Sequence, residues 1–177
     1  KKNEALPWMG FEAREVILEV LDKAIDDKTA EVRVIAYDLN EPEIVKRLEK
    51  LGKRLMVIID NDGAHGKAGS AENQAEKRLK VTAGKQNVKR QHMGKLQHNK
   101  MIVINGTKIK VAICGSTNFS WRGLYVQSNN VLALYGKNSI TPFLTAFQNF
   151  WDFNSAADFS KTASAEWSNL DLNNINA

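Results

Sequence analysis

The sequence predicts an α/β fold in which helices cover a mixed β-sheet. In the first half of the chain, helical and strand-like apolar patterns alternate, which is typical of parallel strands joined by helices. In the second half, Asn105-Gly106 lies between two apolar runs and predicts an antiparallel hairpin. The chain has 177 residues, of which 43% are hydrophobic and 25% charged, enough for one domain with a buried core.

Buried strands are predicted where short runs combine apolar and β-branched residues. They cover residues 32–37, 54–60, 96–104, 107–114 and 131–135. Asp38 and Asp60 lie at the carboxyl ends of the first two, where α/β sheets place functional sites. Capping or turn formation explains both residues at least as well. His65 lies in the following Gly-rich segment and is predicted to be a mobile loop residue.

Helices are predicted where apolar residues recur at helical spacing. They cover residues 11–28, 42–51 and 71–81, and a fourth opens at Thr141-Pro142. Pro42 suits a first helical turn, Gly52 a helix end and Ser70 an N-cap. The apolar stripe of the fourth helix, from Phe143 to Trp151, would belong to the core or to a dimer interface. Residues 1–153 therefore form the predicted domain, and residues 154–177, rich in Ser, Ala and Asn, a tail or linker.

The composition excludes several classes of protein. The apolar run Leu55–Ile59 is far too short to span a membrane, so no transmembrane segment is predicted. A single cysteine, Cys114, excludes an internal disulfide and a multi-cysteine zinc site. This cysteine usage fits a reducing compartment and favours a cytoplasmic location.

Charge is distributed unevenly along the chain. Residues 77–151 contain 12 Lys or Arg and no Asp or Glu, whereas residues 1–76 contain 12 Lys or Arg and 16 acids. A basic surface attracts polyanions, so this block favours a phosphate-bearing partner, although a solvated basic face is the ordinary alternative. Without acids, the block offers neither a glycosidase-type carboxylate pair nor an oxygen-rich metal site.

His98 and Lys100 are the residues of this block that best suit phosphate chemistry. They are two positions apart on a predicted strand, so their side chains lie on one face. The ammonium can neutralise phosphate oxygens while the imidazole attacks or transfers a proton. At the end of the second hairpin strand, Gly115 permits close approach, and Ser116 and Asn118 can bind an oxyanion. Taken singly, each signal also fits a structural role.

The pattern His98-Asn99-Lys100, a hairpin and Gly115-Ser116-Thr117-Asn118 closely resembles the phospholipase D superfamily. The resemblance implies a three-layer α-β-α sandwich with a mixed, largely parallel sheet and helices on both faces. It implies that His98 is the nucleophile that forms a phosphohistidine, or the general acid in the partner copy. Lys100 and Asn118 would hold the phosphate with support from Ser116, and no metal or cofactor would be needed.

Two positions depart from the family pattern. The motif Asp is replaced by Asn105, and a downstream acid that orients the motif His is replaced by Asn129. These changes mark either a subfamily variant or lost turnover. We expect Gly115, Asn105, Asn129 and Arg122 to contact substrate, Arg122 by stacking on a base or sugar.

The resemblance predicts a phosphodiesterase with two copies of the motif in one active site. Because the sequence holds one copy, the other must come from a homodimer or from a second motif-bearing half. The basic block makes nucleic acid the preferred substrate, so the expected activity is that of a nuclease. Hydrolysis of phospholipid headgroups is one alternative, and a catalytically weak module that binds nucleic acid or phosphate is another.

Overall fold

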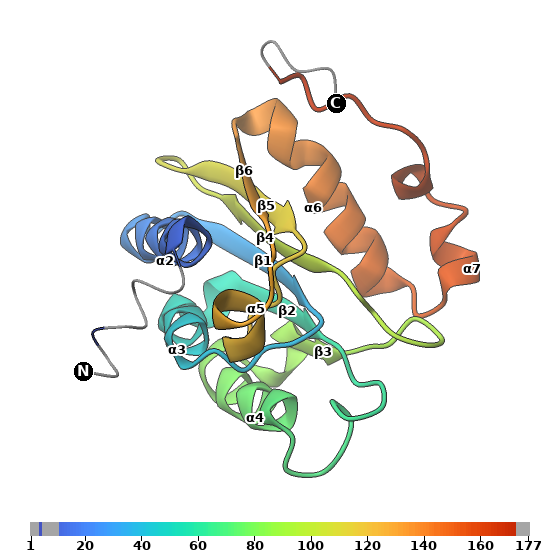
Figure 1. Ribbon diagram of the computed structural model, residues 1–177. Coiled ribbons are helices and arrows are strands. Elements are labelled where there is room, and N and C mark those ends of the chain that lie inside the picture. Colours follow the sequence, from blue (N-terminus) through green and yellow to red (C-terminus); the bar gives the residue numbers. More distant parts are fainter. Residues whose placement is uncertain (1–3, 5–10, 173–177) are drawn as a thin grey trace.

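A six-stranded sheet with the order β3-β2-β1-β4-β5-β6 forms the centre of the computed structural model, which describes residue 4 and residues 11–172 (Figure 1). The strands are β1 (Glu31–Ala36), β2 (Leu55–Ile59), β3 (Val88–Arg90), β4 (Lys100–Asn105), β5 (Lys110–Gly115) and β6 (Val131–Tyr135). Each predicted strand is present, and β3 is a short addition that the apolar pattern does not reveal. The predicted strand over residues 96–104 begins only at Lys100, so the expectation that His98 and Lys100 share a strand was wrong.

The sheet is mixed, as predicted, but it is not largely parallel. β1 pairs with β2 and β2 with β3 in parallel, whereas the β1–β4, β4–β5 and β5–β6 pairs are antiparallel. The reason is the path of residues 91–99. Gln91 N donates to Ile59 O and Gln97 N to the Asp60 carboxylate, so this segment follows the carboxyl edge of β2. The chain therefore enters β4 from that edge and runs opposite to β1.

Helices cover both faces of the sheet, which confirms the three-layer α-β-α arrangement (Figure 1). One face carries α2 (Phe11–Asp26), α3 (Pro42–Leu51), α4 (Ala71–Ala83) and the short α5 (Trp121–Tyr125); the other carries α6 (Lys137–Asp152), with α7 (Ala156–Phe159) outside it. Single 3-10 turns lie at η1 (Gly52–Arg54), η2 (Lys85–Asn87) and η3 (Ala163–Ala165). Among the described residues, no helix has the length and apolar character needed to cross a membrane.

Alternation along β4 explains why the sheet has two cores. Ile102 and Ile104 are buried against the α2–α5 layer, and Met101 and Val103 against α6. This is the two-residue period of a strand covered on both faces. The α6 stripe contributes to the second core through Phe147, which is 1% exposed. Trp121 on α5 is outside both cores and about half exposed.

The segment that follows α6 packs back onto this helix. The Phe159 ring stacks on Phe150 with 4.2 Å between centroids, and Asn149 Nδ2 donates to Ser164 Oγ over 2.7 Å. Part of the predicted tail is therefore in contact with the domain, while residues 173–177 lie outside the described residues. A domain boundary at residue 153 stays a prediction.

The hairpin connection is longer than the predicted two-residue turn. Asn105 is the last residue of β4 and pairs with Lys110, and Gly106 N donates to Ile109 O. Neither Asn105 nor Gly106 has the positive φ that a type I′ turn requires, because the loop closes on Asp27 instead. The Asp27 carboxylate accepts from Lys108 N over 2.7 Å, and a Cβ on Gly106 would collide with this carboxylate and lie 2.9 Å from Ala30 Cβ.

We therefore predict that Gly106→Ala lowers the free energy of unfolding by about 1–3 kcal/mol, because the added methyl forces the loop away from Asp27. Urea unfolding followed by circular dichroism measures the change. The control is Lys108→Ala, which keeps the backbone N–H and removes only an exposed side chain. Equal stability of the two variants would contradict the close contact between the hairpin and Asp27.

Candidate functional site

His98 lies immediately before β4, at the carboxyl edge of β1 and β2. The backbone on each side of it is held by a different segment. Gln97 N donates to Asp60 Oδ1 over 2.8 Å, and Asn99 O accepts from Tyr37 N over 3.1 Å. The His98 ring is also in edge contact with the Tyr37 ring, with 4.7 Å between centroids. The position of the imidazole is therefore fixed by residues that follow β1 and β2.

A cavity of about 490 Å³ opens beside His98. Its lining residues are His98, Lys100, Gly115, Ser116, Asn118, Gln127, Ser128 and Asn129. The fold thus brings together the four predicted catalytic residues and two of the predicted substrate contacts, Gly115 and Asn129. The lining contains amide, hydroxyl, imidazole and ammonium groups but no carboxylate, which suits an anionic ligand.

Lys100 and Asn118 are the most enclosed polar residues of the lining. Lys100 is 8% exposed, and its ammonium donates to His98 O over 2.6 Å and lies 5.0 Å from the centre of the Tyr37 ring. Asn118 is 9% exposed, and its Oδ1 has no hydrogen-bond partner among the described residues. A buried polar atom without a partner normally finds one in water or a ligand. Both side chains are therefore fixed in the cavity wall, where they can contact a bound group.

Gly115 and Ser116 are held against the segment that precedes β6. Gly115 has a φ of +140°, and a Cβ at this position would lie 2.8 Å from Asn130 Oδ1, so only glycine fits. Ser116 Oγ accepts from Asn130 N over 3.0 Å. Asn129 lines the cavity, but its amide nitrogen donates to Gly123 O over 2.9 Å. It supports the cavity wall without supplying the carboxylate that the family places there.

Two predicted substrate contacts, Asn105 and Arg122, are not among the residues that line the cavity. Asn105 lies at the opposite end of β4 from Lys100, where its Oδ1 accepts from Lys110 Nζ over 2.6 Å. Asn105 is therefore separated from the cavity by the length of β4, and a substrate role for it stays a prediction. Arg122 is exposed on α5 and is not among the lining residues of the cavity.

The charged groups around His98 shift its pKa in opposite directions. Burial and the neighbouring Lys100 ammonium lower the pKa of His98, whereas Asp38 and Asp60 act in the other direction. Burial also lowers the pKa of Lys100, again opposed by Asp38. A lowered pKa keeps the imidazole of His98 neutral near pH 7, which is the form that can attack phosphorus.

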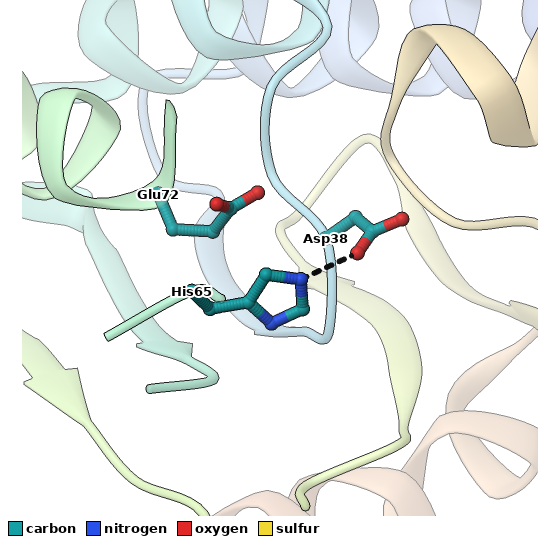
Figure 2. A group of neighbouring side chains, drawn as sticks. All are labelled: Asp38, His65 and Glu72. Atoms are coloured by element: carbon teal, nitrogen blue, oxygen red, sulfur yellow. Dashed lines mark ion pairs between the residues drawn. The ribbon is translucent and has the colours of Figure 1, made fainter. Parts of the chain in front are cut away.

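A network of carboxylates around His65 lies next to His98. Figure 2 shows His65 between Asp38 and Glu72, with 2.9 Å from Nε2 to Asp38 Oδ1. The other ring nitrogen, Nδ1, lies 2.7 Å from Asp60 Oδ2, and the His65 ring is in edge contact with Tyr37, 4.5 Å between centroids. The Tyr37 ring thus contacts both His65 and His98.

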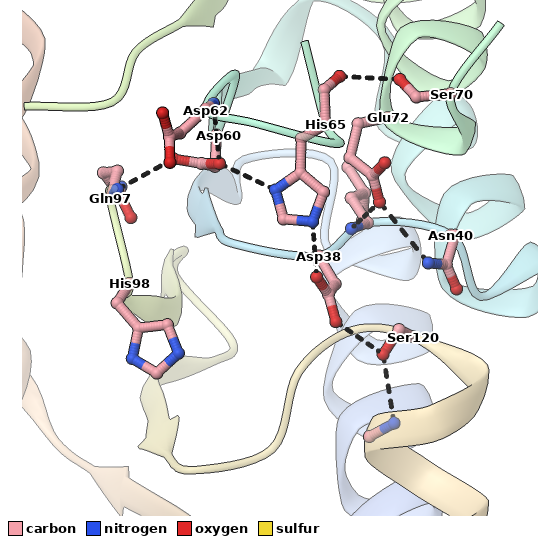
Figure 3. Close-up of polar contacts among 12 residues, drawn as sticks. Asp38, Asn40, Asp60, Asp62, His65, Ser70, Glu72, Gln97, His98 and Ser120 are labelled. Atoms are coloured by element: carbon pink, nitrogen blue, oxygen red, sulfur yellow. Dashed lines mark hydrogen bonds and ion pairs between the residues drawn. The ribbon is translucent and has the colours of Figure 1, made fainter. Parts of the chain in front are cut away.

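The same network reaches from the His98 segment to α5. Figure 3 follows it from Gln97 through Asp60, His65 and Asp38 to Ser120, whose Oγ donates to Asp38 Oδ2 over 3.1 Å. Asp60 is fully buried and the His65 side chain is 14% exposed.

The sequence left Asp38 and Asp60 open between a functional site and a turn or cap role. Asp60 does form a turn, because its Oδ2 accepts from Asp62 N over 3.0 Å, and it also pairs with His65. The prediction that His65 is a mobile loop residue was wrong, because Asp38 and Asp60 hold its ring. The position of both acids at strand ends was the available signal. What the sequence did not reveal is that the loop after β2 folds back over the edge of the sheet.

Some of the cations in the basic block, residues 77–151, form ion pairs within the domain. Arg78 pairs with Glu49, and Arg90 and Lys80 both pair with Glu76, so two acids of the first 76 residues form ion pairs with three of its cations. Lys77, Lys85 and Lys95 are exposed, and none of them has an ion-pair partner within the described part of the chain. These three lysines remain available to an external anion.

A second cavity, of about 390 Å³, lies on the α6 side of His98. It shares His98, Lys100 and Gly115 with the first cavity. Aromatic side chains of α6 and α7 dominate the rest of its wall, with Phe143, Phe150 and Phe159 among them. His98 therefore stands between a polar cavity and an apolar one.

The family model described as the cardiolipin synthase, phospholipase D-like domain matches residues 18–151. The chain belongs to this family. The match includes the whole His98 to Asn118 motif and most of the sheet. A phospholipase D-like domain supports an enzyme of the phosphodiesterase type. No curated protein matches the sequence.

Solved structures share the fold of this phospholipase D-like domain. Nuc from Salmonella typhimurium, a phospholipase D family member, has 24% identity and a TM-score of 0.60 over 79% of this chain and 87% of its own. NucT from Helicobacter pylori has 16% identity and a TM-score of 0.57 over 83% and 92%. Polyphosphate kinase from Porphyromonas gingivalis has 15% identity and a TM-score of 0.61; this chain covers 24% of it, and the match covers 80% of this chain.

We predict that Lys100→Met raises the pKa of His98, because it removes the positive charge that disfavours the imidazolium. The titration of the ring Cε1 proton by NMR measures this directly, and His98→Ala assigns the signal. Lys108→Met, at the far end of the hairpin, is the control and leaves the His98 titration unchanged. A shift to lower pH in Lys100→Met would contradict this account of the site.

Proposed function

We propose that this protein is a metal-independent phosphodiesterase that cleaves nucleic acid through a phosphohistidine on His98. The observation that carries the proposal is the cavity of about 490 Å³ in which His98, Lys100, Ser116 and Asn118 meet without a carboxylate. Such a lining is complementary to the negative charge of a phosphodiester and to the further charge of its transition state. The match to the phospholipase D-like family supports the same reaction type.

In the proposed reaction, a ring nitrogen of His98 attacks phosphorus, a P–N bond forms, and the P–O bond to the leaving group breaks. A second histidine donates a proton to the leaving oxygen. Water then attacks the phosphohistidine and gives a proton to that second histidine, the P–N bond breaks, and a phosphomonoester leaves. The Lys100 ammonium and the Asn118 amide hold the non-bridging oxygens throughout.

The proton donor must come from a second copy of the motif. Of the other histidines, His65 has both ring nitrogens within 2.9 Å of carboxylates, and His92 is exposed and not part of the cavity wall. We therefore propose that His98 of a second copy of the chain, or of a second motif-bearing half, completes the site.

Nucleic acid is the proposed substrate because of the charge around the cavity. Lys95 is exposed on the segment that leads into His98, and Lys77 is exposed on α4, whereas Lys85 precedes β3 at the opposite edge of the sheet. A polyanion gains from several such charges at once, whereas a single phosphate ester contacts only the cavity.

The first test is hydrolysis of bis(p-nitrophenyl) phosphate and of a single-stranded oligonucleotide in EDTA. We expect turnover by the wild type and a loss of at least about 10³-fold in His98→Ala, because the nucleophile is gone. His92→Ala, which removes an exposed histidine outside the cavity, is the matched control and retains full turnover. Turnover that survives in His98→Ala would overturn the mechanism. A wild type that binds the oligonucleotide without cleaving it would exclude an active homodimer and leave either a half-enzyme without its second motif or a binding module.

The second test is the salt dependence of oligonucleotide binding by His98→Ala, which does not consume the ligand. We expect affinity to fall at least about tenfold between 50 and 200 mM NaCl, because binding to phosphates releases counterions. Lys95→Gln weakens binding and flattens the salt dependence. Lys53→Gln, an exposed lysine before the opposite end of β2, leaves both unchanged. Affinity that does not depend on salt would exclude nucleic acid as the substrate.

Phospholipid is the second candidate substrate, and the apolar cavity favours it. Phe143, Phe150 and Phe159 form a hydrophobic wall next to His98, where part of a lipid can pack. Release of headgroups from mixed phospholipid micelles, measured beside the oligonucleotide assay, distinguishes the two substrates. His98→Ala abolishes either reaction.

A further inference from the structure

Asp38, His65 and Glu72 come from three segments and meet at the carboxyl edge of β1 and β2 (Figure 2). One donor atom of each lies within 4.8 Å of the others. We propose that these three side chains form a site for a divalent transition-metal ion, separate from the catalytic cavity. None of the three lines that cavity, so the proposal of a metal site does not rest on the proposed phosphodiesterase reaction.

The contacts of His65 suit a metal ligand. If Nδ1 donates its proton to Asp60, which lies 2.7 Å away, the lone pair of Nε2 points at Asp38 Oδ1 at 2.9 Å. Two electron-rich atoms face each other in that arrangement, and a cation between them removes the repulsion. A histidine whose second nitrogen is bound to a carboxylate is the usual form of a metal-bound imidazole.

Glu72 supplies an independent indication of a missing ligand. It is 4% exposed, yet its Oε1 accepts only two long hydrogen bonds, 3.4 Å from Leu39 N and 3.4 Å from Asn40 Nδ2. Its Oε2 has no hydrogen bond within the described part of the chain, and no Lys or Arg there forms an ion pair with it. A buried carboxylate without a cationic partner is costly, so Glu72 requires a positive charge.

The surroundings hold each ligand in place. Asp60 fixes His65, Ser120 Oγ donates to Asp38 Oδ2, and Asn40 and Leu39 contact Glu72 (Figure 3). Both ring nitrogens of His65 already pair with Asp38 and Asp60, so a protonated imidazole alone leaves negative charge at Glu72. The Asp38 side chain is 21% exposed, which gives an ion a route of entry.

The donor set indicates the class of ion. One imidazole and two carboxylates leave a fourth position for water, which is a common arrangement for Zn²⁺. Mg²⁺ prefers oxygen ligands and retains its waters, so it fits less well. Bound there, the ion would connect the segments that follow β1 and β2 to the first turn of α4.

The test is isothermal titration of ZnCl₂ into the purified chain, free of EDTA and of any histidine tag. We expect one ion per chain, weaker binding of Mg²⁺, and a Tm raised by about 5–10 °C at a free Zn²⁺ concentration 100 times Kd. Glu72→Gln keeps the size of the side chain and removes its charge, and its affinity falls at least about 100-fold. His65→Gln behaves in the same way.

Matched controls show whether the loss belongs to this cluster. His92→Gln removes an exposed histidine, and Asp62→Asn removes an exposed carboxylate of the same loop as His65; both retain wild-type affinity. His98→Ala also retains it, so failure of the metal site and failure of the catalytic mechanism are distinguishable. Absence of saturable Zn²⁺ binding, wild-type affinity in Glu72→Gln, or equal loss in the controls would overturn the proposal.

Discussion

The buried carboxylate of Asp60 organises the edge of the sheet at which the residues of the polar cavity and the His65 cluster gather. One oxygen accepts from Gln97 N over 2.8 Å, and the other accepts from Asp62 N over 3.0 Å and lies 2.7 Å from His65 Nδ1. A fully buried carboxylate must satisfy its hydrogen-bonding capacity within the protein. By doing so, Asp60 joins the strand that precedes it, the loop that follows it and the segment that carries His98.

The antiparallel entry into β4 follows from the same edge. Residues 91–99 lie along the carboxyl ends of β2 and β1, so β4 begins where those strands end. His98 and Lys100 therefore meet residues that parallel strands deliver to that edge, and Gly115 to Asn118 return to it at the end of β5. The polar cavity and the His65 cluster are neighbours because the topology brings both to one edge of the sheet.

The two groups have opposite electrostatic character. The cavity lining combines an ammonium, an imidazole, amides and hydroxyls, whereas three carboxylates surround His65. Tyr37 lies between them and contacts both histidines. This separation of charge suits the two proposed sites, the cavity for an anion and the His65 cluster for a cation. It also places negative charge near His98, although the acid that the family uses is replaced by Asn129.

The sequence by itself determined most of the local elements and most residues of the cavity, but neither β3 nor the lining residues Gln127 and Ser128. Strand and helix periods follow from neighbouring side chains, and His98, Lys100, Ser116 and Asn118 are read from two short motifs. Only the tertiary structure decided that Asn105 lies away from the cavity and that the hairpin loop closes on Asp27. It alone brought Asp38, His65 and Glu72 together. Periodicity is local, whereas these contacts depend on where a loop folds back, which is set by burial and hydrogen bonding between segments far apart in the chain.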